Sequence, residues 1–306
     1  MVSVGTHRLH VQVAGAGSPA VVFDAALGGS ALSWTLVHPE VARVTRACVY
    51  DRAGFGWSDA GPLPRTAGRI ATELRELLHR AGVPPRYVLV GHSFCGFVVQ
   101  LFATRYPTET AGLVLVDPAH PEDWITPNDY DRRQIERGVR LCRRGEIVAR
   151  LGLARVVAAL VAVGALSKAR TLARILSRSG LQPDDESVLA PMWKLPREVR
   201  RSLLWYWTRP KFFQALGSQI ESVSSSAVDV ASVRAAGFGD LPLVTISSNN
   251  QTSERRGYQD ALARLSSRGR HVVAKAGGHW VPLDDPRTVI DAVLDVVNAA
   301  RATAPV

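Results

Sequence analysis

The sequence predicts an α/β protein built on a doubly wound, mostly parallel sheet. Short apolar runs rich in β-branched residues recur along the chain, and segments with helical periodicity separate them. Strands that are apolar throughout are typical of sheets covered by helices on both faces. With 46% hydrophobic and 21% charged residues, the 306-residue chain can also bury a sizeable core, which argues against a disordered protein.

The predicted elements follow one another in a regular order. Six strands are expected at residues 20–23, 47–50, 87–90, 112–116, 241–247 and 271–274. Helices are expected at residues 66–81, which end before Gly82 and Pro84, at residues 97–106, which end before Pro107, and at residues 288–300. Each of these helices carries apolar residues at helical spacing or ends at a residue that cannot continue a helix.

The alternation of strands and helices stops between about residues 121 and 239. This stretch contains helical segments rich in Arg, Leu and Trp, and no run resembling a strand. It is interpreted as a helical insertion, a cap over a core formed by residues 1–120 and 240–306.

The basic charge of the chain is largely compositional. The net charge is +10, but 33 of the 37 basic residues are Arg, and acidic residues are interspersed among them. This argues against a nucleic-acid partner. Residues 121–240 nevertheless carry 19 basic and 13 acidic groups, which is compatible with a weak contact between the basic cap and a membrane surface.

Cysteine usage and the N-terminal residues predict a cytoplasmic protein. Cys48, Cys95 and Cys142 show neither disulfide-like nor zinc-like spacing, and the first residues lack the basic start and apolar run of a secretory signal. The most membrane-like run, residues 156–166, is far shorter than the ~20 residues needed to span a bilayer. It is expected to form a buried or interfacial helix.

The strongest local motif is Gly91-His92-Ser93-Phe94-Cys95-Gly96, directly after a predicted strand. A serine at a sharp strand-to-helix turn needs small residues two positions before and after it, because its backbone is strained. Gly91 fits, and Cys95 is small enough to replace the usual glycine. Ser93 is preferred to Cys95 as the nucleophile, because Cys95 would place bulky Phe97 two positions after itself.

Together with three further motifs, this turn resembles the α/β-hydrolase superfamily over nearly the whole chain. The motifs are Leu27-Gly28-Gly29-Ser30 with Trp34, the segment from Asp51 to Ser58, and Gly277-Gly278-His279. The resemblance implies a mostly parallel eight-stranded sheet with helices on both faces, an inserted helical cap, and a Ser-His-acid triad. It assigns the segment from Asp51 to Ser58 a bracing role without direct chemistry.

His279 is the expected catalytic base, because a serine hydroxyl needs a base to take its proton. The third member should be a carboxylate. After the predicted strand 241–247, where much of the family carries its acid, the sequence has only amides. Asp117, at the end of the strand 112–116, is therefore preferred, while Asn250 as an orienting amide and the distant Asp240 remain alternatives.

The backbone amides of Leu27 and Phe94 are the expected oxyanion hole, by alignment with the family's loop after the third strand. Substrate contacts are expected from an aromatic set that would favour a hydrophobic small molecule. Its members are Trp34, His120, Trp124, Trp205 and Trp280.

These residues predict a serine hydrolase that cleaves an ester, lactone or thioester without a metal or another cofactor. The same triad could serve C–C bond hydrolysis, perhydrolysis or acyl transfer. A low-turnover, receptor-like ligand-binding protein is a further alternative, motivated by the absent acid after residue 247 and by Ala25-Ala26 in the oxyanion loop. The oligomeric state is left open.

Overall fold

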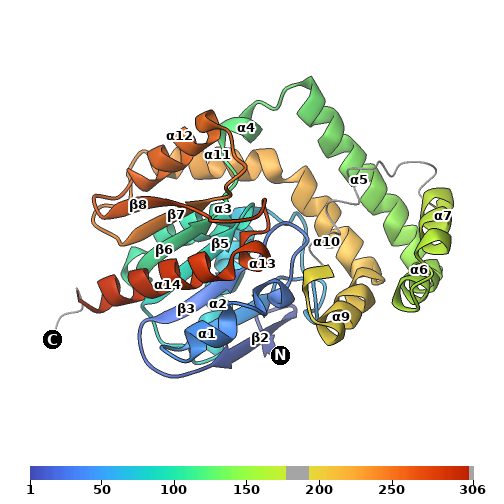
Figure 1. The fold of residues 1–306 in the computed structure, drawn as a ribbon, viewed down its shortest axis with the longest axis horizontal. Helices are drawn as coiled ribbons and strands as arrows, with labels where there is room; N and C mark the ends of the chain where they lie inside the picture. The colour runs from blue at the N-terminus through green and yellow to red at the C-terminus, as the bar shows by residue number, and fades with distance from the viewer. Residues whose placement is uncertain (177–192, 303–306) are drawn as a thin grey trace.

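The computed structural model describes residues 1–176 and 193–302. Its centre is one eight-stranded sheet in the order β1-β2-β4-β3-β5-β6-β7-β8 (Figure 1). β2 pairs antiparallel with β1 and β4, and the other neighbouring strands are parallel. The mostly parallel sheet predicted from the sequence is confirmed.

The strands are β1 (Val2–Ser3), β2 (Arg8–Ala14), β3 (Ala20–Asp24), β4 (Ala47–Asp51), β5 (Tyr87–His92), β6 (Thr110–Val116), β7 (Leu243–Ser247) and β8 (Gly269–Val273). The helices up to β6 are η1 (Ala31–Trp34), α1 (His38–Ala42), α2 (Ala67–Arg80), α3 (Cys95–Arg105) and η2 (Pro107–Glu109). Between β6 and β7 lie α4 (Glu122–Ile125), α5 (Asp129–Arg150), α6 (Leu153–Ala162), α7 (Leu166–Leu176), α9 (Arg197–Trp207), α10 (Pro210–Glu221) and α11 (Val223–Arg234). The last helices are α12 (Ser253–Ala263), α13 (Val281–Asp284) and α14 (Pro286–Arg301).

Two apolar layers sandwich the sheet. Alternate residues of one strand point to opposite faces, so Val22 of β3 packs with α2 and α3, whereas Val21 and Phe23 pack with α1 and α14. β5 divides its side chains between the two layers in the same way. This double coverage explains why the central strands are apolar at every position, the pattern that predicted them.

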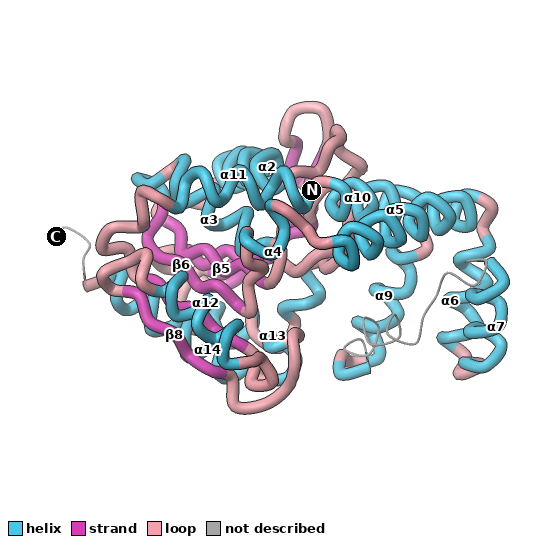
Figure 2. Tube along the Cα trace, turned by 90° about the horizontal axis from the view of Figure 1, so that it is seen from above, coloured by secondary structure: helices cyan, strands magenta, loops and turns pink. Residues whose placement is uncertain are grey.

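The described residues between β6 and β7 form helices and turns and contain no strand. α5 packs along α10, while α6 and α7 lie at the end of the molecule away from the sheet (Figure 2). α11 instead packs on α2 and α3, and its buried residues Val223, Ala227 and Val230 belong to the main core cluster. A separate cap at residues 121–239 stays a prediction, and this packing associates α11 with the core.

No helix among the described residues combines the length and the apolar character needed to cross a membrane.

Candidate active site

The turn between β5 and α3 has the predicted strained geometry. Ser93 has φ +55°, in the left-handed region that non-glycine residues rarely adopt. A Cβ at Gly91 would lie 2.5 Å from the carbonyl oxygen of Cys95, so only glycine fits at this position. The turn therefore projects the Ser93 side chain at the carboxyl end of the sheet.

Cys95 points away from this edge into the core. It is fully buried, and its Sγ lies 2.8 Å from Nη1 of Arg52. Burial raises the pKa of the Cys95 thiol well above its usual value, which keeps the sulfur protonated. These surroundings favour Ser93 over Cys95 as the nucleophile.

A chain of hydrogen bonds connects the three residues predicted as a triad. Nε2 of His279 lies 2.9 Å from Oγ of Ser93, and Nδ1 of the same ring lies 2.6 Å from Oδ2 of Asp117. These two partners determine the tautomer of His279: Nδ1 donates to the carboxylate, and Nε2 accepts from the hydroxyl. Ser93 directly follows β5, Asp117 directly follows β6, and His279 lies in the loop before α13.

Backbone hydrogen bonds fix the distance between the serine and the carboxylate. The amide of Ser93 donates to the carbonyl of Val116 at 3.0 Å, and the amide of Asp117 donates to the carbonyl of Ile246 at 2.6 Å. Asp117 itself has φ +41°, so a second turn at the sheet edge carries backbone strain. Strained residues at both strand ends are typical of a functional site.

The second oxygen of Asp117 is held by two donors from the segment after β7. Oδ1 accepts hydrogen bonds from the amide of Ser248 at 2.9 Å and from Nε2 of Gln251 at 2.5 Å. Burial alone would raise the pKa of Asp117, but the hydrogen bond from His279 and the Ser248 amide lower it below its ordinary value. Asp117 is therefore ionised at neutral pH.

Gln251 is the residue that sequence reasoning did not single out. The amide-rich run after β7 was recognised, but Asn250 was considered as the orienting amide, and no hydrogen bond joins Asn250 to Asp117 or His279 among the described residues. The other alternative, Asp240, is exposed and precedes β7, so it lies at the opposite edge of the sheet. The sequence shows the run of amide residues after β7, but it does not show which of their side chains is close enough to Asp117 to donate a hydrogen bond.

The loop that carries His279 is held from two sides. Nε2 of His92 donates to the carbonyl of His279 at 2.7 Å, and the amide of Gly278 donates to Asp284 at 2.9 Å. Burial, followed by the proximity of His279, lowers the pKa of His92 to about 3. His92 is thus neutral and acts as a fixed donor to the loop.

The two amides predicted as an oxyanion hole have no partner among the described residues. Neither the amide of Leu27 nor that of Phe94 donates to another group in this part of the chain. The register pairs Asp24 with Gly91, so the loop after β3 begins beside the serine turn.

Arg52 lies beneath this loop and belongs to the segment from Asp51 to Ser58, for which the sequence predicts a bracing role without direct chemistry. Its buried guanidinium donates to the carbonyls of Ala25 at 2.5 Å, Ala26 at 2.8 Å and Gly29 at 3.3 Å, and also to the carboxylate of Asp24 at 2.5 Å. Because Arg52 holds each of these carbonyls from the inner side, the loop conformation is fixed although Ala25 and Ala26 themselves offer no polar side chain.

Comparison with known proteins concerns the fold that carries these residues. A family model described as the alpha/beta hydrolase fold matches residues 19–154. A "putative epoxide hydrolase" from Pseudomonas aeruginosa superposes with a TM-score of 0.72 at 18% identity, covering 99% of this chain and 96% of the other. A thermophilic esterase from Thermogutta terrifontis gives a TM-score of 0.65 at 19% identity, with coverages of 96% and 94%.

The family-model match over residues 19–154 and the solved structures show that this chain has the α/β-hydrolase fold. Among curated proteins, the chain is 33% identical to the probable transporter efuK of Hormonema carpetanum over 127 residues, which are 39% of this chain. The matched region spans only 18% of that relative. The solved structures, at these identities, establish the fold.

The aromatic residues predicted to contact substrate occupy different environments in the structure. Trp34 is fully buried against Phe23 and His92, so the expected substrate contact is not supported, because its ring is needed in the core. Trp205 is exposed beneath the guanidinium of Arg209, which lies 3.9 Å from the ring centroid.

Trp280, His120 and Trp124 lie nearer the site or the core beside it. The Trp280 ring centroid is 6.3 Å from that of His279. His120 is buried against Tyr258, and Trp124 packs on the main core cluster. Of the predicted set, Trp280 has the most direct position for contact with a bound molecule.

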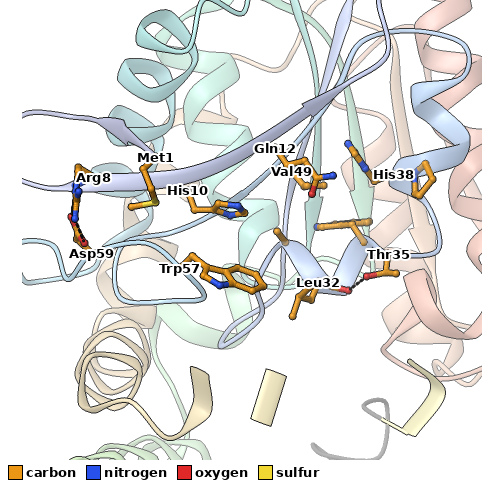
Figure 3. Close-up of a pocket in the computed structure, with 13 residues that line it drawn as sticks. Met1, Arg8, His10, Gln12, Leu32, Thr35, His38, Val49, Trp57 and Asp59 are labelled. Carbon is orange, nitrogen blue, oxygen red and sulfur yellow. Dashed lines mark hydrogen bonds and ion pairs between the residues drawn. The ribbon is translucent and has the colours of Figure 1, made fainter. Parts of the chain in front are cut away.

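A separate cavity of about 550 Å³ lies beside β2 (Figure 3). His10, Gln12 and Trp57 line it, and His10 is hydrogen-bonded to the buried carboxylate of Asp51 at 2.9 Å. None of the three triad residues lines this cavity. In the described part of the chain, no group of three or more His, Cys, Asp or Glu side chains is placed to hold a metal ion.

Proposed function

We propose that this protein is a serine hydrolase that cleaves an ester, thioester or lactone of a hydrophobic small molecule. The observation that carries the proposal is the continuous hydrogen-bond chain from Ser93 through His279 to the ionised Asp117. A serine hydroxyl within reach of an oriented imidazole is the arrangement that activates it as a nucleophile.

In the proposed first step, Oγ of Ser93 attacks the carbonyl carbon while its proton moves to Nε2 of His279. Asp117 stays ionised and stabilises the resulting imidazolium. The carbonyl oxygen, which becomes negatively charged, accepts hydrogen bonds from the amides of Leu27 and Phe94. Collapse of the tetrahedral species breaks the bond to the alcohol or thiol, which leaves with the proton held by His279.

The resulting acyl-enzyme is hydrolysed by the same groups. His279 takes a proton from water, the hydroxide attacks the acyl carbon, and Ser93 is released when the proton returns to its oxygen. Arg52 does not touch the reacting atoms in this scheme. It is a positioning residue that keeps the loop of Leu27 in place for charge stabilisation.

The hydrophobic character of the substrate is inferred from the residues beside the triad. Trp280 packs with a cluster from α9 and α10 that includes Leu203, Tyr206 and Phe212. A site bordered by such side chains favours an apolar acyl or ring-bearing group.

Labelling with a fluorophosphonate probe tests the proposal. The wild-type protein should be labelled rapidly, Ser93→Ala should not be labelled, and Ser267→Ala, which changes an exposed serine, should react like the wild type. Turnover of p-nitrophenyl esters and lactones of increasing size then defines the substrate class. Folded wild-type protein that neither labels nor turns over these compounds would refute the hydrolase and favour the ligand-binding alternative.

A further inference from the structure

The far end of the helical segment exposes apolar side chains to an unusual degree. Among the described residues, the three most exposed large apolar side chains are Val163 at 78%, Leu151 at 70% and Ile175 at 66%. Ile147 and Val156 are also exposed. These five residues, here named the tip patch, lie within 29 positions of one another (175 − 147 + 1).

α6 supplies the centre of the tip patch and is apolar on all sides. Its exposed residues are Val156, Ala159, Ala162 and the one charged residue, Arg155, and the exposed Val163 follows the helix directly. No residue of α6 is buried. A helix that is apolar all round normally lies in a core or in lipid.

The charge around the tip patch is predominantly positive. From residue 147 to residue 176 the sequence contains five basic residues and no acidic one. The solvent-facing side of α5 leads into the patch with Arg143 and with Arg140 and Arg150, which pair with Glu136 and Glu146 of the same helix. Apolar side chains bordered by arginines are the pattern of helices that lie in the interface of an anionic membrane.

We propose that the tip patch binds the surface of a lipid bilayer containing anionic lipids. α6 has only 10 residues, too few to span the ~30 Å hydrocarbon layer, so its apolar face is immersed at the headgroup boundary while the arginines contact lipid phosphates. The location at the end of the molecule away from the sheet lets the helices reach a flat surface (Figures 1 and 2). A second copy of the chain is the less favourable occupant, because two such basic surfaces would repel one another.

Co-sedimentation with vesicles tests this proposal. The wild-type protein should bind vesicles of equal parts phosphatidylglycerol and phosphatidylcholine, bind pure phosphatidylcholine at least about tenfold more weakly, and lose affinity as salt is added. Val156→Ser with Val163→Ser should weaken binding about tenfold or more. Arg150→Gln with Arg155→Gln should remove the preference for phosphatidylglycerol.

The matched control changes two exposed valines elsewhere, Val13 on β2 and Val228 on α11, each to serine. This variant should bind within about twofold of the wild type, and circular dichroism verifies that each variant is folded. Ser93→Ala should also bind normally, so lipid binding and the proposed hydrolysis can fail separately.

Three results would overturn the proposal. They are a wild-type protein that binds no vesicle at low salt, equal losses in the tip and control variants, and self-association without lipid that Val156→Ser with Val163→Ser abolishes. The last result would assign the tip patch to a second copy of the chain.

Discussion

The carboxyl end of the sheet around Ser93 and the tip of the helical segment differ in which groups they bury. At the carboxyl end of the sheet, charged groups are buried and hydrogen-bonded: the guanidinium of Arg52 donates to three carbonyls and Asp24, and Asp117 accepts from three donors. At the tip, apolar side chains are exposed and arginines border them. Buried polar networks fix a geometry, whereas exposed apolar surfaces are suited to contact with something outside the chain.

The largest predicted effect is on the carboxylate of the network. Asp117→Asn should lower kcat about 10⁴-fold, because an amide neither stabilises the imidazolium nor selects the required tautomer of His279. Asp240→Asn, a change at the opposite end of β7, should leave kcat unchanged. Steady-state kinetics of both variants decide between the two acids, and an Asp117→Asn enzyme within about tenfold of wild type would remove Asp117 from the triad.

The second effect concerns acid stability. The pKa of buried His92 is lowered from 6.5 to about 3. Between pH 6.5 and pH 3, this histidine is therefore protonated in the unfolded state and neutral in the folded state. Stability from neutral His92 is thus complete above about pH 6.5 and falls towards pH 3 by up to about 1.4 kcal/mol per pH unit. Urea unfolding across this range should show a shallower pH dependence for His92→Gln, and identical slopes would contradict the expected protonation.

Arg52→Lys should lower kcat about 100-fold with little change in KM. Lysine keeps the charge but cannot hold all the loop carbonyls at once, so the amide of Leu27 is positioned less well. A boronic acid that forms an anionic adduct with Ser93 should bind correspondingly more weakly. Because the site is buried, thermal unfolding is measured alongside, and a folded variant with unchanged kcat would restrict Arg52 to packing.

A smaller effect is expected at the amide that donates to Asp117. Gln251→Leu should lower kcat about tenfold and move the acid limb of the pH profile upwards, because the charged form of Asp117 loses a donor. Asn250→Leu is the matched control and should resemble the wild type. Equal losses in the two variants would point to a general disturbance of the segment after β7.

The smallest effect is predicted at the tip. Val163→Ala should change the free energy of unfolding by less than about 0.5 kcal/mol, because its side chain is 78% exposed. Val90→Ala in β5, which is fully buried, should cost about 2 kcal/mol or more by leaving a cavity. Chemical denaturation of both variants tests whether the two regions differ as the exposures indicate.

The sequence predicted the central strands well because their surroundings are uniform. β3 to β7 are buried at every position, so an apolar run is a sufficient signal for each. β1 and β2 lie at one side of the sheet, where Leu9 is their one buried residue, and no apolar run marks them in the sequence. The serine turn was equally readable, because sterics alone demand Gly91.

What the sequence could not supply was the reach of individual side chains. Arg52 is 43 positions from Cys95 and Gln251 is 134 positions from Asp117, so their contacts depend on the folded sheet. Trp34 was expected at the substrate for the same reason: aromatic character does not distinguish a core ring from an exposed one. Local patterns predict elements and turns, whereas partners across the sheet require coordinates.

The order of the triad along the chain has a practical consequence. Ser93 and Asp117 both precede the long helical stretch, and His279 follows it, so the proposed catalytic turnover requires that β7 and β8 have docked on the rest of the sheet. The rate at which activity returns after dilution from denaturant would therefore measure how fast distant parts of the polypeptide assemble. It would not measure the formation of local structure.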